Sequence, residues 1–152
     1  MGTQGENFGD VHAAILRQHV EIRARLRGLD AGATPGSSTL FTALSLRVSL
    51  FRLAVLFESH LRYEELELAP RIRDLDAWGA AREAALLAEH DEQRTRIERA
   101  CFVAESEVIG GDLAHEVSSL VVSLLDDMAR EERELSELEQ LCTGGQLEQM
   151  TG

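Results

Sequence analysis

The sequence predicts an all-α protein, an up-down-up-down bundle of four helices, and three observations lead to this prediction. Ala, Leu, Glu and Arg are abundant, and all four residue types favour helix. Only two prolines occur, Pro35 and Pro70, so few positions interrupt a helix. Short Gly-containing or polar breaks divide the chain into four long segments, and short connections favour antiparallel neighbours.

The breaks set the boundaries of the predicted elements. We expect a flexible arm at residues 1–9, one bundle domain at 10–142 and a flexible tail at 143–152. The domain should contain four helices, at residues 10–29, 39–73, 80–108 and 112–142. Asp10 is a suitable N-cap for the first helix. Pro70 should kink or terminate the second helix.

Each predicted helix carries a stripe of apolar residues at spacings of three and four, and polar residues interrupt every stripe. The interruptions are His19 in the first helix, His60 and Glu64 in the second, His90 and Arg94 in the third, and Asp127 and Glu131 in the fourth. A buried carboxylate without a partner costs several kcal/mol, whereas a whole domain is stable by only ~5–15 kcal/mol. A bound cation accepts the lone pairs of such groups, so the pattern predicts a metal site between the helices.

Each interruption alone has an ordinary explanation, because a histidine on an apolar stripe is more often a core or rim residue than a ligand. The combination is more informative. His60 and Glu64 are one helical turn apart, as are Asp127 and Glu131, so each pair shares a helix face. Three further groups are expected to have no role in the site, since His12 falls near the rim, His115 lies off the stripe, and the acidic run that includes Glu132 resembles a solvated face.

Four stretches of the chain carry a family resemblance. They are ILRQHVEI at residues 15–22, FESHLRYEELELAP at 57–70, LAEHDEQR at 87–94 and LLDDMAREE at 124–132. In this order they resemble the four helices of the hemerythrin-like, or HHE cation-binding, family. The resemblance implies a hemerythrin-like bundle that binds two irons and uses them for dioxygen binding or sensing, peroxide chemistry, or the handling of iron and nitric oxide.

The resemblance also implies roles for individual residues. It makes His19, His60 and His90 metal ligands, and it makes Glu64 and Glu131 bridging carboxylates. Two positions depart from the family pattern, since Asp127 and Arg94 stand where many members have histidines. Either Asp127 is itself a ligand, as its spacing from Glu131 suggests, or Asp127 and Arg94 form a buried pair and leave a reduced site. We therefore take Asp127 as the sixth expected ligand.

The leading functional hypothesis is a non-haem, di-iron protein that handles dioxygen or peroxide as its small ligand. Whether it is an enzyme stays open, and no catalytic residue or organic cofactor site is predicted. One metal per chain, or another divalent metal, is the alternative to two irons. Two rival functions are a non-catalytic helical interaction module with a structural or reduced metal site, and iron buffering.

Composition restricts the other expectations. The net charge of −12 without a basic patch argues against a nucleic-acid partner. No apolar run approaches the ~20 residues of a membrane span, and no secretory signal is visible. The two cysteines make no disulfide framework. We therefore expect a cytoplasmic protein that does not bind membranes, and the sequence does not identify a protein partner.

Overall fold

The computed structural model describes residues 6–33, 40–106 and 111–150, and within them it is helical except at short connections. The four long helices are α1 (Phe8–Gly32), α2 (Leu40–Tyr63), α4 (Gly79–Ser106) and α5 (Gly111–Met150). A π-helical turn, η1 (Glu64–Leu68), and the short α3 (Ala69–Arg73) continue the direction of α2. The all-helical prediction with four long helices is thus confirmed.

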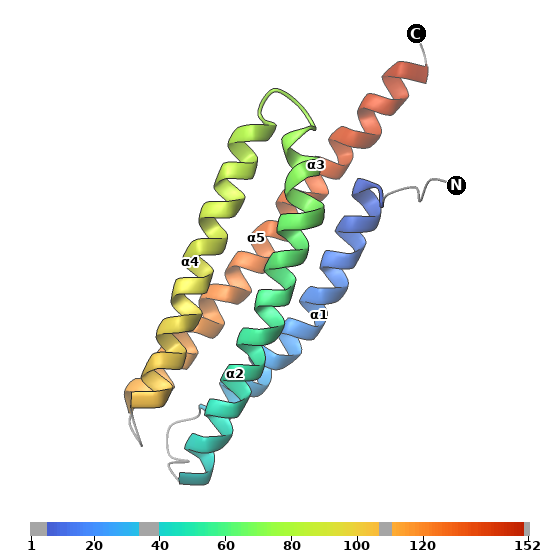
Figure 1. The fold of residues 1–152 in the computed structure, drawn as a ribbon. Helices are drawn as coiled ribbons and strands as arrows, with labels where there is room; N and C mark the ends of the chain where they lie inside the picture. Colours follow the sequence, from blue (N-terminus) through green and yellow to red (C-terminus); the bar gives the residue numbers. More distant parts are fainter. Residues whose placement is uncertain (1–5, 34–39, 107–110, 151–152) are drawn as a thin grey trace, which may run out of the picture.

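Successive long helices run in opposite directions, as Figure 1 shows. The helix α1 packs against α2 and α5, and α4 packs against the same two helices from the other side. The short α3 also packs against α4. Each long helix therefore has two long neighbours, and the four surround a common interior. None of the helices in the described part of the chain is both long and apolar enough to cross a membrane.

The observed helix ends differ from the predicted ones at both termini. Asn7, and not Asp10, is the N-cap of α1, because Asp10 is the third helical residue and completes a capping box with Asn7. At the other terminus, α5 continues beyond residue 142 to Met150. Gly144 and Gly145 lower helix propensity by about 1 kcal/mol each without preventing helix formation. Most of the predicted 30–38 loop and Gly110 lie outside the described residues.

The connection predicted at residues 74–79 agrees with the structure, where it lies between Arg73 and the start of α4. Gly79 makes this tight connection possible. A Cβ atom at this position would lie 2.1 Å from the backbone oxygen of Arg73, so no larger residue fits without a shift of the backbone.

Pro70 distorts the helix but does not end it. Proline lacks a backbone N–H, and its ring clashes with the carbonyl four residues earlier in a regular α-helix. Here the preceding residue, Ala69, bonds instead to the carbonyl of Glu64, five residues back, which is the π-helical pattern. The helix regains α geometry and ends at Arg73. The irregular turn therefore begins at Glu64, one of the predicted ligands.

The apolar interior consists of two clusters, and the predicted site residues lie between them along every long helix. On α1, His19 separates Ile15 of one cluster from Ile22 of the other. Along α2 and its continuation η1, Glu64 lies between Leu61 and Leu68. On α5, the corresponding residue is Glu131, between Met128 and Leu135. A polar layer thus crosses the bundle between two hydrophobic cores.

The stripe predicted for this helix, which ran through Leu87, His90, Arg94 and Ile97, is partly wrong for α4. Leu87 is 39 % exposed and Arg94 is only half-buried. The buried face carries His90, Gln93 and Ile97, followed by two alanines, Ala100 and Ala104. Few large apolar residues occur in this helix, so two neighbouring registers fit the three-and-four spacing nearly equally well.

Candidate metal centre

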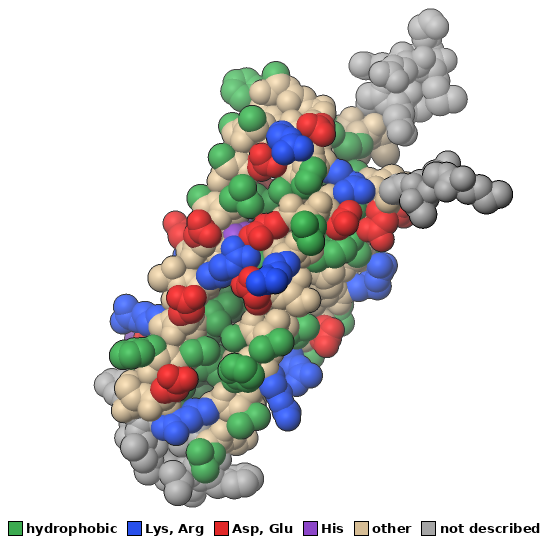
Figure 2. Space-filling view, in the orientation of Figure 1, with side chains coloured by type: hydrophobic (Ala, Val, Ile, Leu, Met, Phe, Trp, Pro, Cys, Tyr) green, Lys and Arg blue, Asp and Glu red, His purple; other side chains and the backbone are tan. Residues whose placement is uncertain are grey.

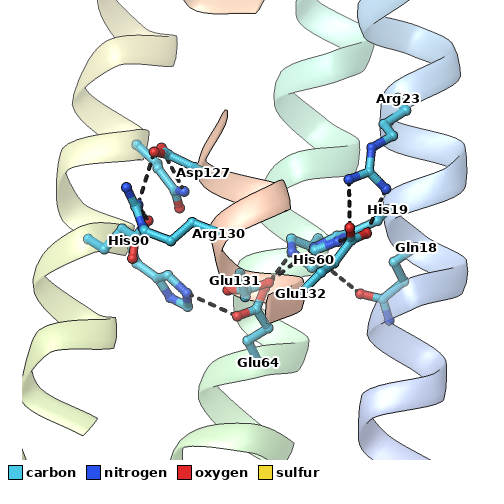
Figure 3. A network of polar contacts seen from close by, with 12 residues as sticks. Gln18, His19, Arg23, His60, Glu64, His90, Asp127, Arg130, Glu131 and Glu132 are labelled. Carbon is cyan, nitrogen blue, oxygen red and sulfur yellow. Dashed lines mark hydrogen bonds and ion pairs between the residues drawn. The ribbon is translucent and has the colours of Figure 1, made fainter. Parts of the chain in front are cut away.

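Four of the predicted ligands converge in the polar layer, two of them histidines and two glutamates. They are His19 on α1, His60 on α2, Glu64 at the start of η1 and Glu131 on α5 (Figure 3). One potential ligand atom from each lies within 4.8 Å of the others. His19 Nε2 is 3.1 Å from Glu131 Oε1, and His60 Nε2 contacts Glu64 Oε1. This spacing allows a single cation to reach all four side chains.

His90 approaches the same group from α4. Its Nε2 lies 3.4 Å from Glu64 Oε2, whereas His60 contacts the other oxygen of the same carboxylate. Glu64 therefore lies between two candidate metal positions. It shares the first position with His19, His60 and Glu131, and the second with His90. The residues of the first position come from α1, from α2 with its continuation η1, and from α5, so its geometry depends on correct packing of the bundle.

The site is enclosed except at Glu131, whose side chain is 15 % exposed. His19 and Glu64 are fully buried, His90 is 1 % exposed and His60 is 4 % exposed. Figure 2 accordingly shows hardly any histidine colour on the face that it presents. Electrostatic interactions are stronger in such a water-poor interior, and unpaired polar atoms are correspondingly costly.

Each of the three histidines in the polar layer, His19, His60 and His90, points its other ring nitrogen, Nδ1, at an acceptor outside the group. His19 Nδ1 is 3.1 Å from Glu132 Oε1, and His90 Nδ1 is 3.0 Å from Glu65 Oε1. His60 Nδ1 is 2.7 Å from Gln18 Oε1. Because these partners are acceptors, the Nδ1 atoms donate their protons outward. The neutral tautomer then leaves the Nε2 lone pair of each ring facing the interior of the group.

The acceptors are themselves held in place by arginines. Arg23 donates two hydrogen bonds, of 2.6 and 2.8 Å, to the carboxylate of Glu132. Arg94 lies 2.8 Å from Glu65 and also bonds Glu58 at 2.9 and 3.2 Å. These charged partners orient the carboxylates that orient the imidazoles. Outer partners of this kind fix ring tautomer and direction in metal-binding proteins.

The atoms that face the interior lack hydrogen bonds. His19 Nε2, His90 Nε2 and both carboxylate oxygens of Glu64 are buried without a hydrogen-bond partner among the described residues. The contacts of 3.1 and 3.4 Å given above are within ion-pair range but do not have hydrogen-bond geometry. Buried polar atoms are nearly always satisfied in native proteins, so a bound cation would account for these four.

The electrostatics of the group favour an added cation. Burial alone would raise the pKa of Glu64, but the imidazoles of His60 and His90 outweigh it and hold that pKa well below its usual range. Burial and the adjacent Glu64 carboxylate raise the pKa of Glu131 well above its usual range. Burial, followed by the charge of His60, lowers the pKa of His19. Two carboxylates this close resist being ionised together unless a positive charge lies between them.

The pKa of His90 shifts in the opposite direction from that of His19. Burial opposes its protonation, but the Glu64 and Glu65 carboxylates outweigh burial and raise the pKa of His90 above its usual value. The difference arises because burial and the charge of the neighbouring His60 imidazole outweigh the Glu132 and Glu64 carboxylates at His19, whereas at His90 the two carboxylates outweigh burial.

Asp127, the sixth expected ligand, lies outside the four-residue group. Its carboxylate accepts bonds from Gln93 at 3.2 Å and from Arg96 and Arg130 at 3.1 Å each (Figure 3). Arg94 turns to Glu58 and Glu65, so the alternative Arg94–Asp127 pair does not form either. The register of α4 explains the difference, because Gln93 and not Arg94 faces the interior beside Asp127.

The sequence did not predict the outer partners, which are the acceptors Gln18, Glu65 and Glu132 of the three Nδ1 atoms. Glu132 was interpreted as part of a solvated face, yet its carboxylate contacts both His19 and Arg23. Glu65 and Glu132 are each the second residue of a Glu-Glu pair whose first member lies in the group, and this shared pattern is the signal that could have found them. His12 was expected at the rim but is buried, and its Nδ1 lies 2.5 Å from Glu139.

Comparisons of the chain with models of known protein families, with curated proteins and with solved structures gave no match. The functional proposal is therefore built from the side chains of the site, together with the sequence resemblance.

Proposed function

We propose that this chain is a non-haem metal protein in which His19, His60, Glu64 and Glu131 hold a divalent cation. One observation carries the proposal. The Nδ1 atoms of His19 and His60 face acceptors outside the group, and His19 Nε2 and both Glu64 oxygens are buried without a hydrogen bond where the four side chains meet. A metal ion is the partner that accepts lone pairs from all four side chains at once.

Protons are the rival partners; they suit Glu131 and His90, whose pKa values are raised, but not His19. The Nδ1 atoms already carry protons, so protonation at Nε2 would create buried imidazolium ions. Burial opposes this at His19, whose pKa is lowered. A divalent cation instead offsets the charges of Glu64 and Glu131 while leaving the imidazoles neutral.

Iron is our first choice of metal. Mixed imidazole and carboxylate ligands from the interior of a helical bundle are typical of iron and manganese sites, and the hemerythrin-like resemblance selects iron. An iron ion held there supplies coordination positions and redox chemistry for a small ligand, for which we propose dioxygen or peroxide. The protein side chains bind the ion, fix the imidazole orientation and exclude bulk water.

Metal analysis tests this function and separates it from its rivals. Protein purified from iron-supplemented cells should contain iron and absorb in the near-ultraviolet, and the absorption should change with peroxide or reductant. Bound iron with an unresponsive spectrum would instead favour a structural metal, the second candidate, which the complete burial of His19 and Glu64 supports. Protein without any metal would reject both.

The two positions beside Glu64 are unequal. The first has four side chains, whereas the second has only His90 and the second oxygen of Glu64. Arg94 and Asp127, which stand where many members of the family have histidines, are held in other ion pairs. We therefore propose one tightly bound metal per chain and a weaker second one, in place of two equivalent irons.

Restoring the missing histidines should strengthen the second position. We expect the Arg94→His/Asp127→His variant to bind close to two metals per chain under conditions in which the wild-type protein binds one. The matched control is Arg99→His/Asp126→His, which adds the same side chains at exposed positions of the same helices. Equal stoichiometry in the two variants, measured by metal titration, would show that the second position is not where we locate it.

The outer acceptor of His60 offers a second test. Gln18→Met removes the oxygen that orients this ring, and loss of such partners typically weakens metal binding by ~10–100-fold. Competition with a chelator of known affinity measures the change. Gln140→Met, the same substitution at an exposed position of α5, should have no effect. An unchanged affinity in Gln18→Met would mean that His60 is not held in its binding orientation by this bond.

A further inference from the structure

A cavity of about 370 Å³ lies between α3, α4 and α5, and the side chain of Glu131 forms part of its wall. The same residue belongs to the candidate metal group. The volume falls within the range of ligand pockets in proteins, ~300–1,000 Å³. The cavity therefore joins the surface of the bundle to the polar layer at a point where a small molecule would approach the metal ligands.

The cavity has two chemically different ends. Along α5 its lining runs from Glu131 and Glu134 to Leu138 and Leu141, a distance of about 15 Å at 1.5 Å per residue. The antiparallel α4 contributes Glu89 near the Glu131 end and Ala85 further along. Three of the four lining carboxylates thus lie toward the metal group, and the wall beyond them is mostly aliphatic, with Glu137 and Arg82 as its charged members.

Negative charge is in excess at the end of the cavity formed by Glu89, Glu131 and Glu134. Arg130 contacts Glu89 and lies 4.0 Å from Glu134, but the same guanidinium also bonds Asp127. Arg82, which lines the other end, bonds both carboxylate oxygens of Asp76 at 2.8 Å. A ligand with a positive, hydrogen-bond-donating head would complement the carboxylates, and an apolar tail would complement the leucines.

We propose that this cavity binds a small organic amine with an apolar chain, with the ammonium group between Glu89 and Glu134 and the chain along Leu138 and Leu141. The position of the amine beside a metal rests on the proposed function, whereas the cavity and its charges do not. The ligand class follows from the lining, since an acid would meet carboxylates and a wholly apolar molecule would leave them without a partner.

Calorimetric titration with hexylamine, hexan-1-ol and hexanoate tests the inference on the metal-loaded protein. We expect hexylamine to bind about tenfold or more tightly than hexanoate, a difference typical of one favourable charge contact. Ala85→Trp should fill the exposed rim of the cavity and abolish binding. Ala84→Trp is the matched control, because Ala84 is also exposed on α4 but does not line the cavity.

The charge contact has its own variant. Glu134→Gln should weaken hexylamine binding about tenfold and leave hexan-1-ol unchanged, whereas Glu92→Gln, at an exposed site outside the cavity, should change neither. Hexanoate binding as tightly as hexylamine, or full binding by Ala85→Trp, would overturn the inference. Metal content is measured on the same samples. Bound metal without amine binding rejects this site alone, and amine binding by protein that cannot bind metal rejects the proposed function alone.

Discussion

Glu64→Gln should remove most of the bound metal, with affinity falling by more than the ~100-fold seen when outer partners are lost. Glutamine preserves the shape of the side chain but removes the negative charge and one acceptor oxygen. Glu64 contacts both His60 and His90 and is fully buried, so solvent does not replace it. His60→Ala should have a similar effect, since it deletes a ligand of the four-residue group.

Metal content per chain, measured by elemental analysis after dialysis, checks this prediction. His115→Ala serves as the control, because His115 is exposed on α5 and should leave the metal content unchanged. Circular dichroism verifies that each variant stays helical. If all three variants kept the wild-type amount of metal, the site would have to lie elsewhere in the molecule.

The second large effect concerns stability. A metal present at a thousand times its dissociation constant stabilises the folded state by ~4 kcal/mol. For a chain of 152 residues, each kcal/mol shifts the melting temperature by roughly 2–4 °C. Removing the metal with a strong chelator should therefore lower the melting temperature by roughly 8–16 °C, because the buried carboxylates and imidazoles then lose the partner of their lone pairs.

Thermal melts of metal-loaded protein with and without the chelator measure this shift. Glu64→Gln provides an internal control, since a variant that binds no metal should melt at the same temperature in both conditions. Superimposable wild-type melts, from protein shown beforehand to contain metal, would indicate that the ion is bound at the surface and not in the polar layer.

The helical architecture could be predicted because burial imposes a simple periodicity. The apolar stripes of α1 and α5 identified the buried face correctly. They also showed His19 and Glu131 as polar residues that interrupt this face. In α4 the method failed, since small alanines carry little pattern and Arg94 was assigned to the interior in place of Gln93. That error of register underlies the alternative of an Arg94–Asp127 pair, whereas Asp127, which we took as the sixth ligand, bonds Gln93, Arg96 and Arg130 instead.

The outer partners and the π-helical turn were less accessible to sequence reasoning. Gln18 and Glu132 lie beside the stripes, at positions that a periodicity analysis assigns to the helix flank. Their contacts depend on how closely α1 approaches its neighbours, which spacing along one helix does not reveal. Pro70 indicated an irregularity nearby, but proline is compatible with a kink, an end or a π-turn, and only the fold selects among them.

Anomalous X-ray diffraction from crystals of the purified protein, recorded on both sides of the iron absorption edge, tests the central claim most directly. We predict a strong anomalous peak among His19, His60, Glu64 and Glu131, with ligand atoms about 2.0–2.2 Å away, as is usual for metal bonds to nitrogen and oxygen. A polar layer without a peak for iron or any other metal, in which direct hydrogen bonds join His19 Nε2 to Glu131 and His60 Nε2 to Glu64, would contradict it.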